Sequence, residues 1–183
     1  MRISTGRGDD GETDLWGGRR VGKDDVRIEA CGSVDELSSA LGRVLALELQ
    51  GDLRQSLERI QDFLFRLGSD LANPAWPVEN PYLNADCTQQ LEHWIERYEK
   101  DLPALKSFIL PGGCPAGAAL HWTRAVCRRA ERRVQTLAST EPINEVAIPF
   151  LNRLGDLLFL MARWANLQAG RKESIWRQGG KST

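Results

Sequence analysis

The chain has 183 residues, a formal net charge of −1 at pH 7 and 42% hydrophobic residues. This length suits one domain around a single core, and the near-neutral charge excludes a general electrostatic attraction to nucleic acid or to anionic membranes. No hydrophobic run reaches the roughly 18–20 residues of a membrane-spanning helix, and residues 1–11 lack the apolar core of a signal peptide. We therefore expect a cytoplasmic protein that has neither a membrane nor a nucleic acid as partner.

The first predicted element is a loop over residues 1–26, which is rich in glycine and polar residues and shows no helical or alternating period. From residue 27 onward the hydrophobic positions have helical spacing, which predicts five helices over about 27–49, 53–73, 87–102, 116–139 and 144–169. No segment is predicted to form a strand. The second helix is the clearest, since its hydrophobic positions step by four and three residues along one face: Leu53, Leu57, Ile60, Leu64, Leu67 and Leu71.

Five helices with short connections predict an all-α fold, a five-helix antiparallel bundle. We assign residues 1–183 to a single domain, in which residues 27–171 form the bundle and residues 172–183 a polar tail that frays from about Ser174. The four cysteines lie far apart without a CxxC pair, so free thiols are expected. Because the chain has two histidines and no His/Cys cluster with zinc spacing, no protein-bound metal site is predicted.

The N-terminal loop is the first candidate for a binding site. Glycines let backbone N–H groups converge on an anion and threonine hydroxyls add donors, but no Gly-Lys-Ser/Thr follows, so this is not a Walker A loop. The acidic residues of the loop require a cation or arginine partners nearby. From composition alone, a flexible tail is the favoured explanation of the loop, and from spacing alone Lys23 and Arg27 are better explained as solvated charges.

Arginines dominate the fourth predicted helix. Arg124, Arg128 and Arg132 recur every four residues and so share a face; Arg129 and Arg133 lie beside it. Guanidinium groups bind phosphates well, which suits a triphosphate. A solvated face paired with acids from other helices is an equal alternative. Nucleic acid is a weaker one, because no aromatic residues are interleaved with the arginines.

Polar residues also occur within apolar helical patterns, at Asp35, His121, Asn152 and Asp156. Buried polar groups need partners, and the two aspartates could pair with arginines of the fourth helix. Structural ion pairs or exposure to solvent explain them equally well. For His121 the simplest explanation is a surface position or a satisfied place in the core.

Four sequence strings, in order along the chain, resemble the PduO-type ATP:cob(I)alamin adenosyltransferases. The strings are Thr5–Thr13; Arg20–Asp25, which runs into Arg27–Ala30 and Val34–Leu37; Phe108–Gly113; and Cys127–Arg132 followed by Phe150–Leu154. The similarity extends from about residue 3 to residue 171. It implies a transferase that moves the 5′-deoxyadenosyl group of ATP to the cobalt of cob(I)alamin and yields adenosylcobalamin and triphosphate, with Mg²⁺ as cofactor.

The resemblance also implies a homotrimer that binds ATP between adjacent subunits, with the corrinoid in an apolar pocket beside it. Phe108 would press on the lower face of the cobalt, Arg128 would hold the triphosphate, and Asp35 would pair with Arg124 across the interface. A flavoprotein-type reductase and an adenosylcobalamin-dependent enzyme are the implied partners. The residues that would bind the nucleotide are Thr5, Gly6, Gly8, Asp9, Gly11, Thr13, Lys23, Arg128, Glu131, Arg132 and Asn152.

Three positions depart from the usual pattern of this family. Cys31 stands where an aromatic residue is frequent, Ser38 where asparagine is usual and Gly155 where serine is usual. The first two bear on how the corrinoid packs, and no charged member of the implied site is missing. Two other functions stay open: a non-enzymatic carrier of nucleotide or corrinoid, which would keep the same pocket, and a helical module that binds nucleic acid through its arginines.

Overall fold

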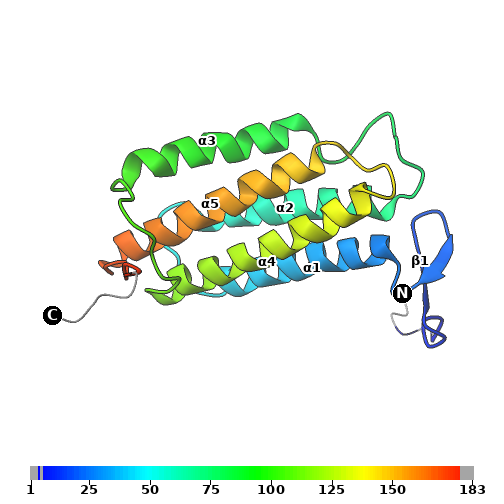
Figure 1. Ribbon diagram of the computed structural model, residues 1–183, viewed down its shortest axis with the longest axis horizontal. Coiled ribbons are helices and arrows are strands. Elements are labelled where there is room, and N and C mark those ends of the chain that lie inside the picture. The colour runs from blue at the N-terminus through cyan, green and yellow to red at the C-terminus, as the bar shows by residue number, and fades with distance from the viewer. Residues whose placement is uncertain (1–3, 5, 178–183) are drawn as a thin grey trace.

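The computed structural model describes residue 4 and residues 6–177. Consecutive helices run in opposite directions and form a bundle, and a small hairpin lies at one of its ends (Figure 1). The predicted all-α five-helix bundle is therefore confirmed. The elements are β1 (Glu12–Asp14), β2 (Arg20–Gly22), α1 (Val26–Leu45), α2 (Leu53–Ala72), α3 (Ala85–Asp101), α4 (Pro115–Ala138) and α5 (Ala147–Gln168).

The hairpin corrects the prediction that no strand is present. β1 and β2 pair antiparallel, with Thr13 opposite Val21, and the turn between them contains Gly17 and Gly18, both with φ near +83°. Glycine adopts this left-handed conformation without steric penalty. The hairpin rests on the bundle through a hydrogen bond from the Trp16 N–H to the Ala72 carbonyl at the end of α2 (3.1 Å). Strands of three residues are too short to show an alternating pattern in the sequence.

The core lies between the helices, and α5 contacts both α3 and α4 while α1 contacts α2 and α4. The predicted hydrophobic face of α2, from Leu53 to Leu71, is at most 1% exposed. Burial of each such side chain contributes roughly 1.5–3 kcal/mol. Phe63 of α2 meets Phe150 of α5 edge to face, with ring centroids 6.2 Å apart. In the described part of the chain, no helix combines the length and the apolar character needed to cross a membrane.

Helix ends follow local hydrogen bonding. The Asp25 carboxylate accepts from the Arg27 N–H (2.8 Å) and begins α1, whereas α1 ends at Leu45 rather than at residue 49. At this end the Arg54 guanidinium donates to the carbonyls of Leu45 and Leu47 (2.9 and 3.3 Å). Terminal helix carbonyls need such partners outside the helix.

Two polar residues, one in the first turn of α1 and one before α5, are ordered by contacts that the sequence did not reveal. Arg27 is 1% exposed rather than solvated, and its guanidinium binds Glu141 (2.6 Å) and the Leu71 carbonyl (2.6 Å). Asn144 lies before α5 rather than in it, because its side chain donates to Asp70 (2.8 Å) and to the Leu83 carbonyl (2.7 Å). Both side chains therefore join the end of α2 to neighbouring loops, and Figure 1 shows the end of α2 and the loop before α5 at the hairpin end of the bundle.

The tail is more ordered than predicted. Residues 174–176 pair with residues 108–110 through hydrogen bonds from Leu110 N to Ser174 O (2.7 Å) and from Trp176 N to Phe108 O (2.8 Å), with Ile109 opposite Ile175. We call these two paired segments the terminal ribbon. Hydrophobic residues within the otherwise polar tail make this pairing favourable. The remainder of the predicted tail, 178–183, lies outside the described residues.

Candidate functional site

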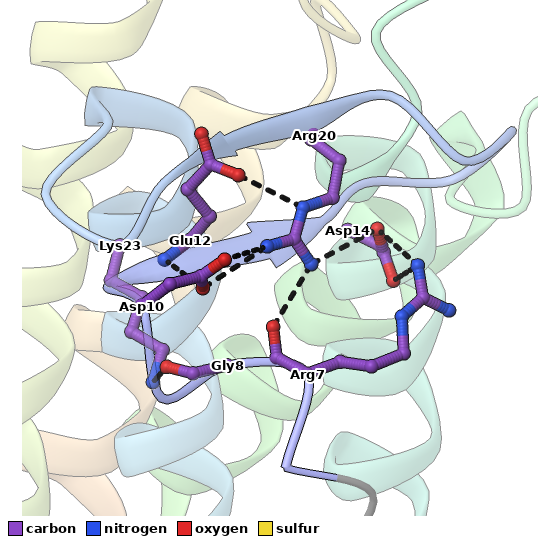
Figure 2. A network of polar contacts seen from close by, with 7 residues as sticks. All are labelled: Arg7, Gly8, Asp10, Glu12, Asp14, Arg20 and Lys23. Carbon is purple, nitrogen blue, oxygen red and sulfur yellow. Dashed lines mark hydrogen bonds and ion pairs between the residues drawn. The ribbon is translucent and has the colours of Figure 1, made fainter.

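Arg20 organises the acidic residues of the N-terminal hairpin (Figure 2). Its guanidinium binds Asp10 (2.9 Å) and Glu12 (3.0 Å), approaches Asp14 (3.8 Å) and donates to the Arg7 carbonyl (3.0 Å). The arginine partner that the acidic loop requires is therefore present. The pKa of Asp10 is lowered, chiefly because the backbone N–H of Glu12 donates to it, with a further contribution from Arg20.

Sequence reasoning did not single out Arg20 as a site residue. A signal was available, because acidic residues occupy alternate positions from Asp10 to Asp14. Side chains at alternate positions of an extended segment point to the same side. Such a row of carboxylates is favourable only when a cation lies against it, and Arg20 is the residue that β2 places there.

The same hairpin brings several predicted nucleotide-binding residues together. Lys23 donates to the Gly8 carbonyl through Nζ (2.7 Å) and its N–H donates to the Gly11 carbonyl (2.9 Å). A Cβ on Gly8 would lie 3.1 Å from the Lys23 Nζ, so glycine lets the ammonium approach this closely. Gly6 and Gly11 have φ of 70° and 84°. Asp9 is exposed in this loop, Thr13 is half-buried in β1, and Thr5 lies outside the described residues.

The arginines of α4 divide into two groups. Arg129 binds Glu36 (2.5 Å) and Arg133 binds Glu29 (3.0 Å), so both join α4 to α1. Arg128 and Arg132 are exposed, and in the described part of the chain neither forms an ion pair. Arg129 and Arg133 therefore fit the explanation of a solvated face that pairs with acids from another helix. The guanidinium groups of Arg128 and Arg132 stay available to a ligand.

The exposed arginines adjoin other predicted residues on what we call the α4/α5 face: Arg124, Arg128, Glu131, Asn152 and Phe159. Asn152 donates to Glu131 (3.2 Å), and a Cβ on Gly155 would lie 3.9 Å from the Arg128 Cγ. The Arg124 guanidinium lies over the Phe159 ring, 5.4 Å from its centroid. Sequence reasoning missed Phe159, because an aromatic residue in an apolar helix is normally read as core.

Asp35 lies on a different surface, the α1/α2 face, which we define by Trp16, Asp35 and Phe65. These residues line a hollow of about 270 Å³ together with Cys31 and Ser38, two of the three positions that depart from the family pattern. Trp16 and Phe65 are 64% and 71% exposed. Within the described part of one chain neither Asp35 nor Asp156 pairs with an arginine of α4, and both are exposed.

Phe108 lies in the segment between α3 and α4. Its side chain is 79% exposed and meets only the edge of Trp176 among aromatic rings in the described residues, with centroids 6.5 Å apart. An open hollow of about 510 Å³ lies beside it, bounded also by Leu105 and Lys106. Figure 1 places the loop before α4, which carries Phe108, at the end of the bundle opposite to the hairpin.

Buried titratable groups lie close to both faces. His121 is 6% exposed and its ring meets Phe159 with centroids 5.9 Å apart. Burial lowers the pKa of His121, and the positive charge of Arg124 lowers it further. All four cysteines are free thiols, as predicted; burial raises the pKa of Cys31 to about 11 and that of Cys127 further still. These thiols are therefore poor nucleophiles.

Relatives of the chain share one enzymatic description. A family model described as cobalamin adenosyltransferase matches residues 3–165. A cobalamin adenosyltransferase of Cupriavidus metallidurans is 43% identical over 182 residues, which cover 99% of this chain and 97% of the relative. The corrinoid adenosyltransferase MMAB of Homo sapiens is 41% identical, with 99% of this chain and 75% of the relative covered.

Solved structures agree with the sequence relatives. A variant of the PduO-type ATP:corrinoid adenosyltransferase from Lactobacillus reuteri, complexed with cobalamin and ATP, has a TM-score of 0.92 at 38% identity and covers 97% of this chain and 100% of that chain. Another variant of that enzyme, complexed with ATP, has a TM-score of 0.88 at 38% identity, with 96% and 100% covered. This chain belongs to the cobalamin adenosyltransferase family.

Proposed function

We propose that the protein is a corrinoid adenosyltransferase, which transfers the 5′-deoxyadenosyl group of ATP to the cobalt of cob(I)alamin and releases triphosphate. The observation that supports the proposal is that only some of the α4 arginines form ion pairs with α1. Arg128 and Arg132 remain exposed beside the Glu131–Asn152 pair, while their neighbours are engaged with α1. Exposed guanidinium groups four residues apart on one helix face suit a triphosphate, and the family to which the chain belongs acts on ATP and a corrinoid.

The active assembly in this proposal is a homotrimer in which the α1/α2 face of one subunit meets the α4/α5 face of the next. Asp35 and Arg124 then pair across the interface, which gives each a partner that the described part of one chain lacks. The hydrophobic surface of Trp16 and Phe65 supports the same arrangement, because exposed aromatic patches mark interaction sites. A head-to-tail contact of this kind closes into a ring when its rotation matches the symmetry.

ATP lies between the two faces in this assembly. One subunit contributes the hairpin with Gly6, Gly8, Asp9, Gly11, Thr13 and Lys23, together with Thr5, and its neighbour contributes Arg128, Glu131, Arg132 and Asn152. The hairpin belongs to the α1/α2 side because Trp16 is anchored to the end of α2 and lines the hollow with Asp35. A contact that brings Asp35 to Arg124 therefore also brings the hairpin toward the exposed arginines.

Mg²⁺ fits this site as a companion of the nucleotide. Among the residues that the structure describes, no three Asp, Glu, His or Cys side chains gather where they could hold a metal ion on their own. Mg²⁺ is usually held by one or two carboxylates together with substrate phosphates. Asp9 and Glu131 are the carboxylates that could complete such a set, and the bound cation would neutralise charge on the triphosphate.

The reaction needs alignment and charge stabilisation rather than a side-chain base. The electron pair of cobalt(I) forms a bond to the 5′ carbon of ATP, and the electrons of the broken carbon–oxygen bond leave with triphosphate. Holding the two substrates in line lowers the barrier by several kcal/mol. Arg128 and Lys23 stabilise the charge that develops on the leaving oxygen. Phe108 occupies the lower face of the corrinoid, so that cobalt(II) loses its lower ligand and is more easily reduced.

The proposal also places the protein in a reaction sequence. Cob(II)alamin must gain one electron before transfer, which calls for a flavoprotein-type reductase, and the product serves an adenosylcobalamin-dependent enzyme. A reducing compartment such as the cytoplasm agrees with four free thiols.

An anaerobic assay with ATP and chemically reduced cobalamin tests the function directly. We expect the absorbance of cob(I)alamin to give way to that of adenosylcobalamin over many turnovers, with one triphosphate formed per alkylated cobalt. A carrier would bind both ligands and form no cobalt–carbon bond. Binding without turnover would therefore replace the enzymatic proposal with the carrier.

A further inference from the structure

Asn166, near the end of α5, is a buried side chain that the mechanism above does not use. It is 2% exposed, and both ends of its amide are engaged with the turn that precedes α4. Its Oδ1 accepts from the Cys114 N–H and its Nδ2 donates to the Gly112 carbonyl, each at 2.9 Å. Because one partner is a donor and the other an acceptor, the site requires a group that offers both.

Two glycines leave room for this amide. A Cβ on Gly113 would lie 2.1 Å from the Asn166 Oδ1, and a Cβ on Gly117 would lie 2.2 Å from the same atom. Gly113 also has a φ of +111°, where other residues are strained. The amide of Asn166 and the turn before α4 are therefore fitted to each other, and a change on either side displaces the other.

The backbone of Asn166 holds the second strand of the terminal ribbon. Its carbonyl accepts from the Arg171 N–H (2.8 Å), three residues before the ribbon strand that begins at Ser174. Its side chain holds Gly112, two residues after the other strand ends at Leu110. One residue of the rigid bundle thus fixes the two strands of the ribbon at the same end.

We propose that Asn166 is a positioning residue that sets the place of Phe108 through the terminal ribbon. The inference rests on the proposed function, which gives Phe108 its role at the cobalt. Phe108 is 79% exposed, so the packing of its own ring contributes little to its position. Its place depends on the backbone of the ribbon. Arg163 of α5 supports that backbone through Glu173 and the Pro103 carbonyl, and Asn166 is the residue that holds the turn directly after the Phe108 strand. Asn166 touches no substrate in this scheme and acts only through Phe108.

Asn144 provides a matched control. It is also 2% exposed, and its amide likewise holds a loop, by donating to Asp70 and to the Leu83 carbonyl at the opposite end of the bundle. Asn166→Ala and Asn144→Ala should therefore lower the melting temperature by similar amounts. Both full-length variants are assayed as assembled protein, below the melting temperature of either.

The two variants should differ in kcat. We expect Asn166→Ala to lower kcat for adenosylcobalamin formation from cob(II)alamin and a chemical reductant by about 10- to 100-fold, the range known for a small misplacement of a reacting group. The KM for ATP should stay close to wild type, and Asn144→Ala should keep the wild-type kcat. In the EPR spectrum of cob(II)alamin bound with ATP, the fraction without a lower ligand should fall in Asn166→Ala as it does in Phe108→Ala.

A double variant tests whether Asn166 acts through Phe108. If it does, Phe108→Ala with Asn166→Ala should be no slower than Phe108→Ala alone, because coupled residues are not additive. Full additivity, or an Asn166→Ala enzyme no slower than Asn144→Ala, would overturn the inference. Absence of transfer in the wild type would instead overturn the proposed function. If Asn166→Ala does not fold, Gly117→Ala displaces the amide without removing it and must give the same pattern.

Discussion

Neighbouring arginines on α4 have different tasks in this account. The Arg129 guanidinium forms an exposed ion pair with Glu36, which contributes about 0–1 kcal/mol to stability, whereas Arg128 is reserved for the triphosphate. Arg128→Ala should lower kcat/KM for ATP at least about 100-fold, the usual loss when a donor to developing charge is removed. Arg129→Ala is the matched control and should stay near wild type. Equal losses in steady-state kinetics of the two variants would refute the special role of Arg128.

His121 should make the stability of the fold depend on pH. Its pKa is lowered by burial and by Arg124, so the unfolded chain binds its proton more readily than the folded chain. The free energy of unfolding is therefore unaffected by His121 above the ordinary histidine pKa of about 6.5. It decreases as the pH falls below that value. His121→Gln should flatten this part of the melting-temperature profile between pH 7 and pH 5. An unchanged slope in the variant would show that another group titrates.

At the level of elements, the hairpin is held in shape by charge. Arg20 binds Asp10 and Glu12, and its removal would leave adjacent carboxylates that repel one another and the triphosphate. Arg20→Met should therefore raise the KM for ATP strongly and change the melting temperature of the bundle little, because the contacts are exposed. Arg7→Met, which loses one exposed pair with Asp14, is the control. An Arg20→Met enzyme with normal ATP affinity would show that the hairpin does not contact the nucleotide.

Predictability also differs among elements. The helices were predictable because a buried face repeats every three or four residues, as in α2. The hairpin was not, since three-residue strands carry no period, although the alternating acids opposite Arg20 could have indicated it. The terminal ribbon and the contact of Asn166 with Cys114 join residues 52 or more positions apart, and no local pattern encodes such a pairing.

The sequence identified which residues belong to the candidate site, but it did not show how they are arranged in space. Resemblance to the family identified the N-terminal loop, the arginines and Phe108, and the ion pair of Arg129 with Glu36 in the structure then separated Arg129 from Arg128. Spacing alone could not make that distinction, because it depends on whether Glu36 of α1 lies opposite a given arginine.

On the scale of the whole molecule, the proposed ATP site forms only when subunits assemble. Asp35→Asn removes the charge that would pair with Arg124 of the neighbouring subunit, and it should shift the protein toward smaller species in sedimentation velocity or weaken corrinoid binding. Asp156→Asn, a change at another exposed aspartate on α5, serves as control. Normal sedimentation together with normal corrinoid affinity in Asp35→Asn would remove this pairing from the interface.

Subunit mixing tests the shared site most directly. Lys23→Ala disables the hairpin of a chain and Arg128→Ala disables its arginine face, so each variant alone should be inactive in forming adenosylcobalamin. If the two groups act from adjacent subunits, dissociating and reassembling a mixture of the variants creates interfaces at which both are intact, and activity returns. If the mixed assembly stays as inactive as its parents although hybrids form, the hairpin and Arg128 of one chain serve the same nucleotide, which contradicts the account.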